Sequence, residues 1–380
     1  MQSSHLQAFV DQFSAAEPVL VDPSRVLAAL AELPDPRARR GIRYQFAHLV
    51  LIMVCSVLAG AKTLVEMAEW AADTARTELA ACGIGAPHAT TLARVFERLD
   101  SDAFDLLAAD WAQGLGRPVA IAVDGKEMRG AKNGTGSRVH LLAAIDQDTH
   151  AVLAQVAVGE KSNEIPQFPV LMDHFRSLTD VVVTADALHT QAGHAHYLAG
   201  RGAHYIFTVK GNQPTLLKQL SETPWERVPT GDRSGATANG RQIVRTVKCA
   251  TLSPGIKFPH ALQAMQITRK SRPVGTRKWH LETVYAVTSL PTYQASPGQL
   301  AGWVRGHWGI ENGLHWRRDV LFHEDKHQAR NGETPRVLAI LRNIAITLLK
   351  CLGHKNLART TRHLRNHPGK ILEMIGFSSR

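Results

Sequence analysis

The sequence is poor in cysteine and has no apolar run long enough to cross a membrane. Its four cysteines lie far apart along 380 residues and form no CxxC pair: Cys55, Cys82, Cys249 and Cys351. Such usage excludes a disulfide framework and a cysteine-based zinc site, and it is typical of reduced thiols in a cytoplasmic protein. The most apolar stretch, 46–61, is shorter than the roughly 20 residues of a membrane helix, so we expect a buried core helix there. The N-terminus lacks a secretory-signal pattern.

Acidic residues are in the minority, and the excess of basic residues is uneven. The net charge is +11, and residues 1–116 hold 9 Lys or Arg and 14 Asp or Glu, whereas residues 117–380 hold 35 and 19. Residues 326–380 alone hold 11 and 2. A basic balance concentrated in one region favours a polyanionic partner, and charge therefore predicts a nucleic acid. The alternative is a basic surface that only keeps the protein in solution.

Helical and strand-like patterns divide the chain near residue 116. Helical spacing of apolar residues occurs at about 45–60, 63–80, 89–99 and 102–115, so we expect an all-helical N-terminal domain over residues 1–116. Strand-like and helical runs then follow in the order β, β, β, α, β, α, β. This is the order of a ribonuclease-H-like mixed sheet, and it predicts an α/β fold.

The second part of the chain, 117–350, is predicted to contain a β-strand insertion at about 222–295. Within it, residues 222–240 have the polar composition of a loop, and three strand-like runs follow. A helix at about 297–322 comes next. We expect four of its apolar side chains to pack inward, namely Trp303, Trp308, Leu314 and Trp316. Residues 351–380 are predicted to form a basic helical tail.

Three acidic residues stand in positions suited to holding metal ions. Asp124 ends the apolar run 118–123, Asp186 ends the run 181–185, and Glu311 lies in the predicted helix. A carboxylate after each of two buried strands, with a third from a helix, predicts a site for two hard cations. Two such ions can clamp the attacking and leaving oxygens of a phosphoryl displacement. The plainer interpretations are an Asp-Gly turn at Asp124 and a helix cap at Asp186.

Two other carboxylates, Glu324 and Asp325, compete with Glu311 for the third position. We prefer Glu311, because its apolar neighbours predict a mostly buried helix, whereas surface charge is expected at the helix end that holds Glu324 and Asp325. A four-residue spacing nearby resembles a zinc site: His315, Asp319, His323 and His327. Ligands stacked along one helix rise by about 5.4 Å per turn and do not converge on one ion, so we expect a polar helix surface instead.

Basic, histidine and amide side chains near these carboxylates, or in turns after a strand, are candidate phosphate ligands. They are Lys126, Arg129, Lys161, His189, Lys210, Asn212 and Gln213. Lysine binds phosphate as a point charge, and amides contact the DNA backbone or the bases. Ordinary turn chemistry is the alternative for the two turns that begin at Lys161 and Lys210.

The ordered motifs resemble those of a known protein family. They are Asp124-Gly-Lys, Lys161-Ser-Asn-Glu-Ile, Thr184-Ala-Asp-Ala-Leu-His-Thr-Gln, Val209-Lys-Gly-Asn-Gln-Pro and Arg305-Gly-His-Trp-Gly-Ile-Glu-Asn-Gly-Leu-His-Trp. In this order, over roughly residues 30–350, they resemble the DDE insertion-sequence transposases of the ISAs type, which include the H-repeat-associated proteins. The segment that begins Leu33-Pro-Asp-Pro-Arg is similar to the helical domain that accompanies the catalytic domain in that group.

The resemblance implies a ribonuclease-H-like catalytic domain that binds two Mg²⁺ or Mn²⁺ ions through Asp124, Asp186 and Glu311. It implies cut-and-paste transposition, in which double-stranded DNA is cleaved at terminal inverted repeats and joined to a target. It also implies a homodimer in a synaptic complex, and a cytoplasmic, nucleoid-associated protein.

Around the third carboxylate, related transposases carry Tyr, Arg and Lys at fixed offsets. This chain has His307 four residues before Glu311, Arg318 seven residues after it, and Arg305 nearby. These three side chains are therefore candidate DNA contacts by resemblance. Arg241 is a further candidate, because the segment that contains it keeps the glycine and both arginines of a family pattern.

Two other functions fit the same sequence. A metal-dependent nuclease needs the same three carboxylates and does not join DNA strands, so a strand-transfer assay separates it from a transposase. A non-catalytic DNA-binding relic keeps the fold and lacks the chemistry. The presence of all three carboxylates favours an enzyme.

Overall fold

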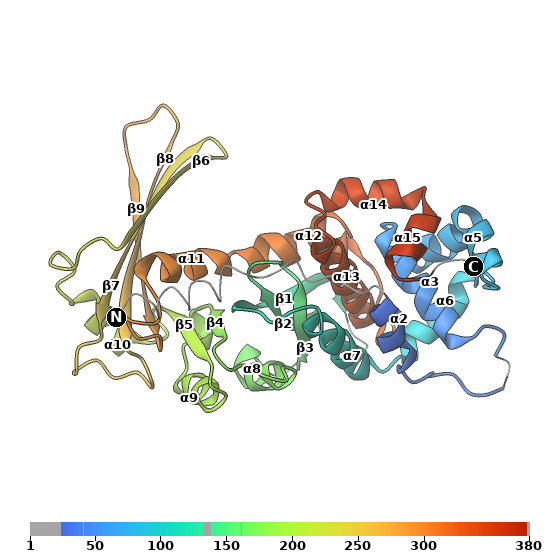
Figure 1. Cartoon of the computed structure of the whole chain (residues 1–380), viewed down its shortest axis with the longest axis horizontal. Helices are drawn as coiled ribbons and strands as arrows, with labels where there is room; N and C mark the ends of the chain where they lie inside the picture. Colours follow the sequence, from blue (N-terminus) through green and yellow to red (C-terminus); the bar gives the residue numbers. More distant parts are fainter. Residues whose placement is uncertain (1–23, 41, 133–137, 161, 378–380) are drawn as a thin grey trace, which may run out of the picture. The chain divides into compact units, whose positions relative to one another are not determined.

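The computed structural model describes residues 24–40, 42–132, 138–160 and 162–377 (Figure 1). The chain divides into two compact units. The described part of unit 1 consists of residues 118–123 and 176–308, and that of unit 2 consists of residues within 24–117, 124–175 and 309–377. No helix in these described ranges has the length and apolar character needed to cross a bilayer.

Helices are the regular elements of the described residues before 118. They are α2 (Ser24–Ala31), α3 (Phe46–Leu58), α4 (Leu64–Glu69), η1 (Trp70–Thr74), α5 (Arg76–Ala81), α6 (Ala89–Arg98) and α7 (Ser101–Gln113). Helix α3 is buried over residues 49–58, so the core helix predicted from its apolar run is confirmed. The Asp100 side chain caps α7 by accepting a hydrogen bond from the Ala103 N–H at 3.0 Å. All these helices belong to unit 2 and do not form a unit of their own.

A mixed sheet follows, and strand β1 (Ala120–Lys132) contributes to both units. In unit 1, β1 pairs in parallel with β4 (Val182–Ala185), which pairs in parallel with β5 (His204–Val209). In unit 2, β2 (Arg138–Asp146) lies next to β1, and β3 (Val152–Val158) lies next to β2. Strands β2 and β3 are antiparallel to each other. The predicted order of strands and helices is confirmed.

The helices that follow β3, β4 and β5 along the chain are short. They are α8 (Glu164–Asp173), η2 (Ala187–His189), α9 (Ala192–Gly200) and α10 (Pro214–Ser221). Helix α8 begins after Asn163, whose side chain accepts a hydrogen bond from the Ile165 N–H. Helix α10 has Pro214 in its first turn, a position where the missing N–H of proline costs nothing.

Strand β1 does not end at Asp124. It continues from Asp124 through Gly125 to Lys132, so the alternative of an Asp-Gly turn is wrong. Gly125 and Gly130 allow the second half of the strand to be approached closely. A Cβ at Gly125 would lie 2.0 Å from Glu164 Oε1, and a Cβ at Gly130 would lie 2.5 Å from the Asp325 carbonyl oxygen.

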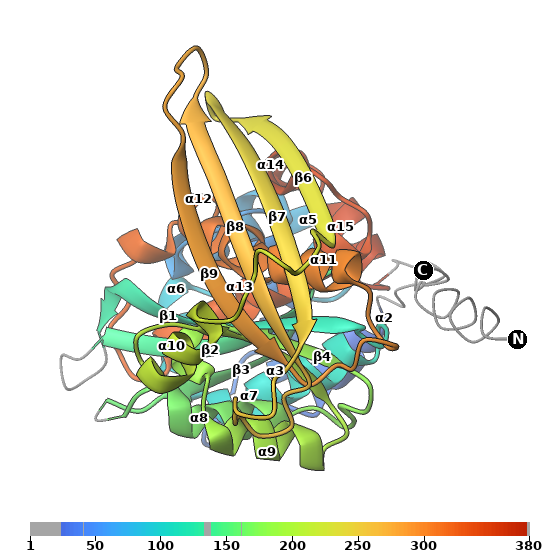
Figure 2. The same ribbon diagram turned by 90° about the vertical axis from the view of Figure 1, so that its left-hand side faces the viewer.

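The β insertion of unit 1 has four antiparallel strands, which Figure 2 shows as long arrows: β6 (Asp232–Ala238), β7 (Arg241–Thr251), β8 (Gln263–Pro273) and β9 (His280–Thr288). Strand β9 joins the insertion to β5. The expectation of a loop is confirmed for residues 222–231 and is wrong for residues 232–238, where β6 lies. Its side chains are mostly exposed, so the apolar alternation that signals a strand is absent.

Helix α11 (Pro297–His307) packs on the insertion through a core that includes Met265, Leu300 and Ala301. The single helix predicted over 297–322 is broken. A π-helical turn, η3 (Glu311–His315), and the short helices α12 (Trp316–Val320) and η4 (Glu324–Lys326) follow α11. Leu314 is buried, but Trp308 and Trp316 are 66% and 55% exposed, so their predicted inward packing is wrong.

Three helices complete unit 2: α13 (Thr334–Cys351), α14 (Leu357–Arg365) and α15 (Pro368–Met374). Helix α13 is buried over most of its length, including Arg336 and Arg342 in part or in full. Arginine is seldom buried without a charged partner. The charged partners of Arg336 are Asp102 and Asp105, and that of Arg342 is Glu324.

Candidate active site

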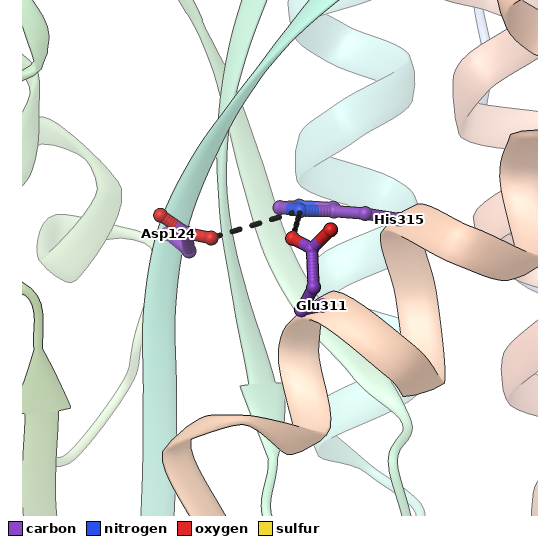
Figure 3. Close-up of side chains that lie close together, drawn as sticks. All are labelled: Asp124, Glu311 and His315. Atoms are coloured by element: carbon purple, nitrogen blue, oxygen red, sulfur yellow. Dashed lines mark hydrogen bonds and ion pairs between the residues drawn. The ribbon is translucent and has the colours of Figure 1, made fainter. Parts of the chain in front are cut away.

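Asp124, Glu311 and His315 meet in unit 2 (Figure 3). Strand β1 carries Asp124, and the π-helical turn η3 carries both Glu311 and His315. His315 Nδ1 lies 3.3 Å from Glu311 Oε2 and 3.7 Å from Asp124 Oδ2, and one ligand atom from each of the three residues lies within 4.8 Å of the other two. Two of the three predicted metal ligands are thus brought together.

Glu311 is the exposed member of this cluster, since its side chain is 59% exposed. The prediction that it lies on a buried helix is wrong, but its exposure gives an ion or substrate access. The His315 hydrogen bond lowers the pKa of Glu311, partial burial raises it, and the charges of His315 and Lys126 lower it further, with a net lowering. A carboxylate that stays ionised is a competent metal ligand.

Lys126 ties strand β1 to the segment after Glu311. Its Nζ lies 2.6 Å from Asp319 Oδ2 on α12 and 3.6 Å from Asp325 Oδ1 on η4. The backbone N–H of Arg129 also donates to Asp325 Oδ1 at 3.2 Å. Together these contacts hold the strand of Asp124 against the helical segment of Glu311. Lys126 was predicted to hold phosphate, and here it makes internal ion pairs.

The imidazole of His150 lies against the backbone on both sides of Glu311. A Cβ at Gly309 would lie 2.9 Å from His150 Cε1, and a Cβ at Gly313 would lie 3.1 Å from His150 Nδ1. His150 comes from the turn between β2 and β3 and has a left-handed backbone conformation, with φ of 59°. The two glycines thus allow the turn that carries His150 to pack closely against the helical segment that carries Glu311.

Glu324 is fully buried, so the expectation of a surface carboxylate at this helix end is wrong. Arg318 Nε donates to both of its oxygens at 2.8 and 2.9 Å, and Arg342 Nη1 donates to Oε1 at 3.0 Å. Burial raises the pKa of Glu324, but the charges of Arg318 and Arg342 outweigh it, with a net lowering. Arg318 is itself fully buried, so we do not retain it as a DNA contact.

A buried polar network extends from this triad. Gln155 on β3 accepts hydrogen bonds from Arg318 and from Asn343, and it donates to Asp105 at 3.1 Å. Arg336 donates twice to Asp105 Oδ2, at 2.8 and 3.0 Å. Asp105 lies on α7 and Arg336 on α13. The network therefore links the N-terminal helices to the segment that follows Glu311.

Asp186, the third predicted ligand, lies in unit 1 directly after β4. Its Oδ1 accepts a hydrogen bond from the Leu188 N–H at 2.9 Å, so the helix-cap interpretation is confirmed for one oxygen. Asn212 and Gln213 donate to the carbonyl oxygens of Ala187 and Thr190. These amides hold the loop that follows Asp186.

His307 also lies near Asp186 in unit 1. Burial lowers its pKa to about 4, against the opposing charge of Asp186, so the ring is neutral at pH 7. Its Nδ1 lies 3.2 Å from Thr184 Oγ1. His189 is fully buried, and its ring stacks on that of His194. Of these two predicted phosphate ligands, His189 is therefore turned into the fold of unit 1, and His307 is half-buried there.

The remaining predicted DNA contacts are spread over the two units. Arg129 is exposed and Lys210 is exposed. Arg241 Nη2 donates to Ser271 Oγ at 3.2 Å, and Arg305 Nη1 lies 3.1 Å from Asp232 Oδ2. Lys161 lies outside the described residues.

The donor set of the unit 2 cluster fits a divalent cation. Carboxylate oxygens are the ligands that Mg²⁺ and Mn²⁺ prefer, and Asp124 and Glu311 supply them from rigid elements. His315 was not predicted to join Asp124 and Glu311, because its spacing with Asp319, His323 and His327 was interpreted as a polar helix surface. Its signal was present as the fourth residue after Glu311, a spacing that brings two side chains to one helix face.

The comparisons with known proteins agree with the motifs. Residues 115–348 match the family described as "Transposase DDE domain", and residues 27–112 match the family described as "DDE_Tnp_1-associated". "Putative transposase YncI" of Escherichia coli O157:H7 is 26% identical over 341 residues, which cover 86% of this chain and 87% of the relative. "H repeat-associated putative transposase YhhI" of Escherichia coli K12 is 25% identical over 348 residues, which cover 86% and 90%.

Among solved structures, a piggyBac transposase synaptic complex with hairpin DNA aligns with a TM-score of 0.47 and 12% identity, covering 94% of this chain and 80% of that one. The resemblance inferred from the sequence motifs is confirmed by the family match, which spans more than half of the chain. The chain belongs to the transposase DDE domain family.

Proposed function

We propose that this transposase cuts DNA at the terminal inverted repeats of a bacterial insertion sequence and joins the ends to a target, with Asp124, Asp186 and Glu311 as its metal ligands. The observation that carries the proposal is the approach of Asp124 to Glu311 inside the family-matched segment. Register supports the inclusion of Asp186. Val123 and Ala185 are partners in the parallel pairing of β1 and β4. Asp124 follows Val123 within β1, and Asp186 follows Ala185 directly after β4.

A ribonuclease-H-like catalytic core fits the sheet. Its five strands have the order β3-β2-β1-β4-β5, with β1, β4 and β5 parallel and β2 antiparallel to β3. Along the sequence, the β insertion comes after β5 and before the helical segment that carries Glu311. This arrangement supports the expected domain organisation, in which residues 117–350 contain the chemistry.

Two bound Mg²⁺ or Mn²⁺ ions would supply an activated water or 3′-hydroxyl and would stabilise the leaving oxygen of the phosphodiester. The protein's own residues orient this chemistry. Asp124 and Glu311 present oxygens from different elements. Lys126 links β1 to α12, and His150 packs against the backbone on both sides of Glu311. Catalysis of this kind depends mainly on positioning and electrostatics.

The β insertion provides a basic surface for the DNA backbone. Arg245 on β7 is the direct cross-strand partner of Arg269 on β8. Burial lowers the pKa of Arg245, and the charges of Arg269 and Arg305 lower it further. Like charges placed opposite each other destabilise a sheet unless an anion compensates them. Glu282 on β9 lies 3.8 Å from Arg269 and compensates part of this charge. A phosphate backbone would supply a further anion beside Arg245, and we propose double-stranded DNA as the partner.

The test is divalent-ion-dependent cleavage and joining of labelled DNA that carries the flanking inverted repeats, with wild type beside Asp186→Ala and Asp124→Ala. Loss of both reactions in the variants, with DNA binding retained, supports the proposal. Cleavage without joining identifies a nuclease instead. Binding of the repeats without cleavage by wild type identifies a DNA-binding relic. Crosslinking of the cleavage complex tests whether two copies of the chain assemble on the DNA, as the proposed homodimer requires.

A further inference from the structure

We propose that His315 is a direct ligand of the divalent ion that Asp124 and Glu311 hold. The unit 2 half of the metal site is then a centre of two carboxylates and one imidazole. This inference rests on the proposed function and adds a nitrogen ligand to the three carboxylates. It is carried by geometry, burial and the conformation of the π-helical turn.

The three side chains already have the spacing of ligands around one ion. Atoms that each bind a cation at about 2.1 Å lie roughly 3 to 4 Å from one another. His315 Nδ1 is 3.3 Å from Glu311 Oε2 and 3.7 Å from Asp124 Oδ2. Figure 3 shows that the imidazole faces both carboxylates, with a dashed line to each. An ion can therefore be placed among the three atoms with only small side-chain adjustments.

Burial fixes which ring atom faces the ion. The His315 side chain is 5% exposed, and its Nε2 is buried without a hydrogen-bond partner among the described residues. The polar contacts that orient the ring are those of Nδ1. With an ion bound, Nδ1 would give up its proton and present its lone pair to the metal, and Nε2 would carry the ring proton.

The π-helical turn places both ligands on one face. The Trp316 N–H donates to the Glu311 carbonyl oxygen, which closes a turn wider than that of an α-helix around Glu311 and His315. π-Helical turns are frequent at functional sites. Here the turn has a direct consequence, because it directs the two side chains toward Asp124 of strand β1.

A nitrogen ligand changes the ion that the site selects. Mg²⁺ prefers oxygen donors, whereas imidazole suits first-row transition ions, among which Mn²⁺ also accepts carboxylates. We therefore expect the wild-type protein to bind Mn²⁺ more tightly than Mg²⁺. Replacement of His315 should lower the Mn²⁺ affinity roughly tenfold or more, and should lower the Mg²⁺ affinity less.

The decisive measurement is pulsed electron paramagnetic resonance of Mn²⁺ bound to the full-length wild-type protein without DNA. Two samples are compared, one at natural isotope abundance and one with ¹⁵N-labelled histidine. We expect a hyperfine coupling from directly bound nitrogen that changes with the label. Bound Mn²⁺ that shows no histidine nitrogen coupling overturns the inference and leaves His315 as a hydrogen-bond donor to Glu311.

Variants then assign the coupling to a residue. His315→Asn should abolish it, His354→Asn should retain it, and Glu311→Gln should weaken Mn²⁺ binding as a whole. Circular dichroism and thermal unfolding show whether His315→Asn is folded, and the wild-type spectrum decides the question if it is not. A coupling that survives in folded His315→Asn contradicts the inference. Failure of Asp124→Asn and Glu311→Gln to change Mn²⁺ binding would instead contradict the proposed metal site itself.

Discussion

Glu324 is a single residue on which the segment beside the active site depends. Its carboxylate is fully buried and neutralises parts of two buried guanidinium groups, those of Arg318 and Arg342. Removing one member of a buried ion pair leaves an uncompensated charge in a poorly solvated position. Two arginines would be left in that state here. The cost of losing Glu324 should therefore far exceed that of losing a surface carboxylate.

Glu324→Gln is expected to lower the free energy of unfolding by about 3–5 kcal/mol. Glu373→Gln, at an exposed position on α15, removes the same charge and should change it by less than about 0.5 kcal/mol. Urea denaturation at pH 7.5 measures both. Equal effects of the two substitutions would show that the buried triad has no special role in stability.

His327 gives stability a pH dependence. Burial, with a smaller contribution from the Arg342 charge, lowers its pKa to about 4. Below about pH 6.5 the His327 imidazole is protonated in the unfolded chain but stays neutral in the folded chain. The free energy of unfolding therefore falls as the pH drops toward 4. Because the ring is partly exposed, we expect a loss of roughly 1 kcal/mol at pH 5. His327→Gln should reduce the difference in urea stability between pH 7.5 and pH 5 by that amount.

The sequence points to the candidate acidic ligands more readily than to their surroundings. Asp124 and Asp186 follow apolar runs, which is a local signal, and Glu311 lies in an ordered motif. The burial of Glu324 has no local signal, because its partner Arg342 comes from a different helix. His315 was overlooked as a partner of Asp124 for the same reason, since strand β1 supplies the contact.

At the level of elements, the segment from α11 to α12 shows how one turn changes a helix. The π-helical turn η3 interrupts the α-helical repeat of 3.6 residues per turn. Residues after η3 therefore do not lie on the helix face that an uninterrupted α-helix over 297–322 would give them. This is why Trp316 is exposed although the α-helical pattern predicts burial. Strands β1 to β5 were predictable because their apolar runs are short and bounded by turn residues.

Gly309 and Gly302 make a matched pair within this segment. Gly309→Ala would place a Cβ 2.9 Å from the His150 ring, whereas Gly302→Ala on α11 meets nothing within 4 Å. We expect Gly309→Ala to destabilise the protein by about 1–3 kcal/mol and Gly302→Ala to stabilise it by about 0.5–1 kcal/mol. Thermal unfolding compares them. The combination of Gly309→Ala with His150→Gly should be less than additive, and simple additivity would contradict the contact.

The β insertion carries a prediction about DNA. Arg245→Ala and Arg269→Ala should each weaken binding of double-stranded DNA and reduce the slope of log affinity against log salt by about 1. Lys257→Ala removes a charge from an exposed position between β7 and β8 and should leave that slope unchanged. Fluorescence anisotropy at several salt concentrations measures the slopes. Identical slopes for all three variants would place the DNA elsewhere.

In the molecule as a whole, the N-terminal helices and the segment after Glu311 share a core in unit 2. Asp105 of α7 contacts Arg336 of α13 and Gln155 of β3. The change of pattern near residue 116 is visible in the sequence, and the family matches divide there too. That the two sides of this boundary pack into one unit was not predictable, because no local pattern encodes contacts between distant helices.

A fragment of residues 117–380 is therefore expected to lack a cooperative unfolding transition, because it leaves Arg336 without Asp102 and Asp105 and uncovers α13. Near-ultraviolet circular dichroism and urea denaturation test this against the full chain. Full-length Asp105→Asn, which keeps the helices, should still unfold cooperatively at a lower urea concentration. A fragment as stable as the full chain would show that residues 1–116 are dispensable for folding.

The hydrogen bonds from Arg336 to Asp105 also bear on inheritance. The two family segments look like separate modules, and recombination between related elements could exchange one for the other. A chimaera that received foreign helices without carboxylates at the levels of Asp102 and Asp105 would leave Arg336 with neither of these counter-ions. Such hybrids would be eliminated through misfolding before selection acted on their choice of DNA ends, so the two segments are expected to descend together.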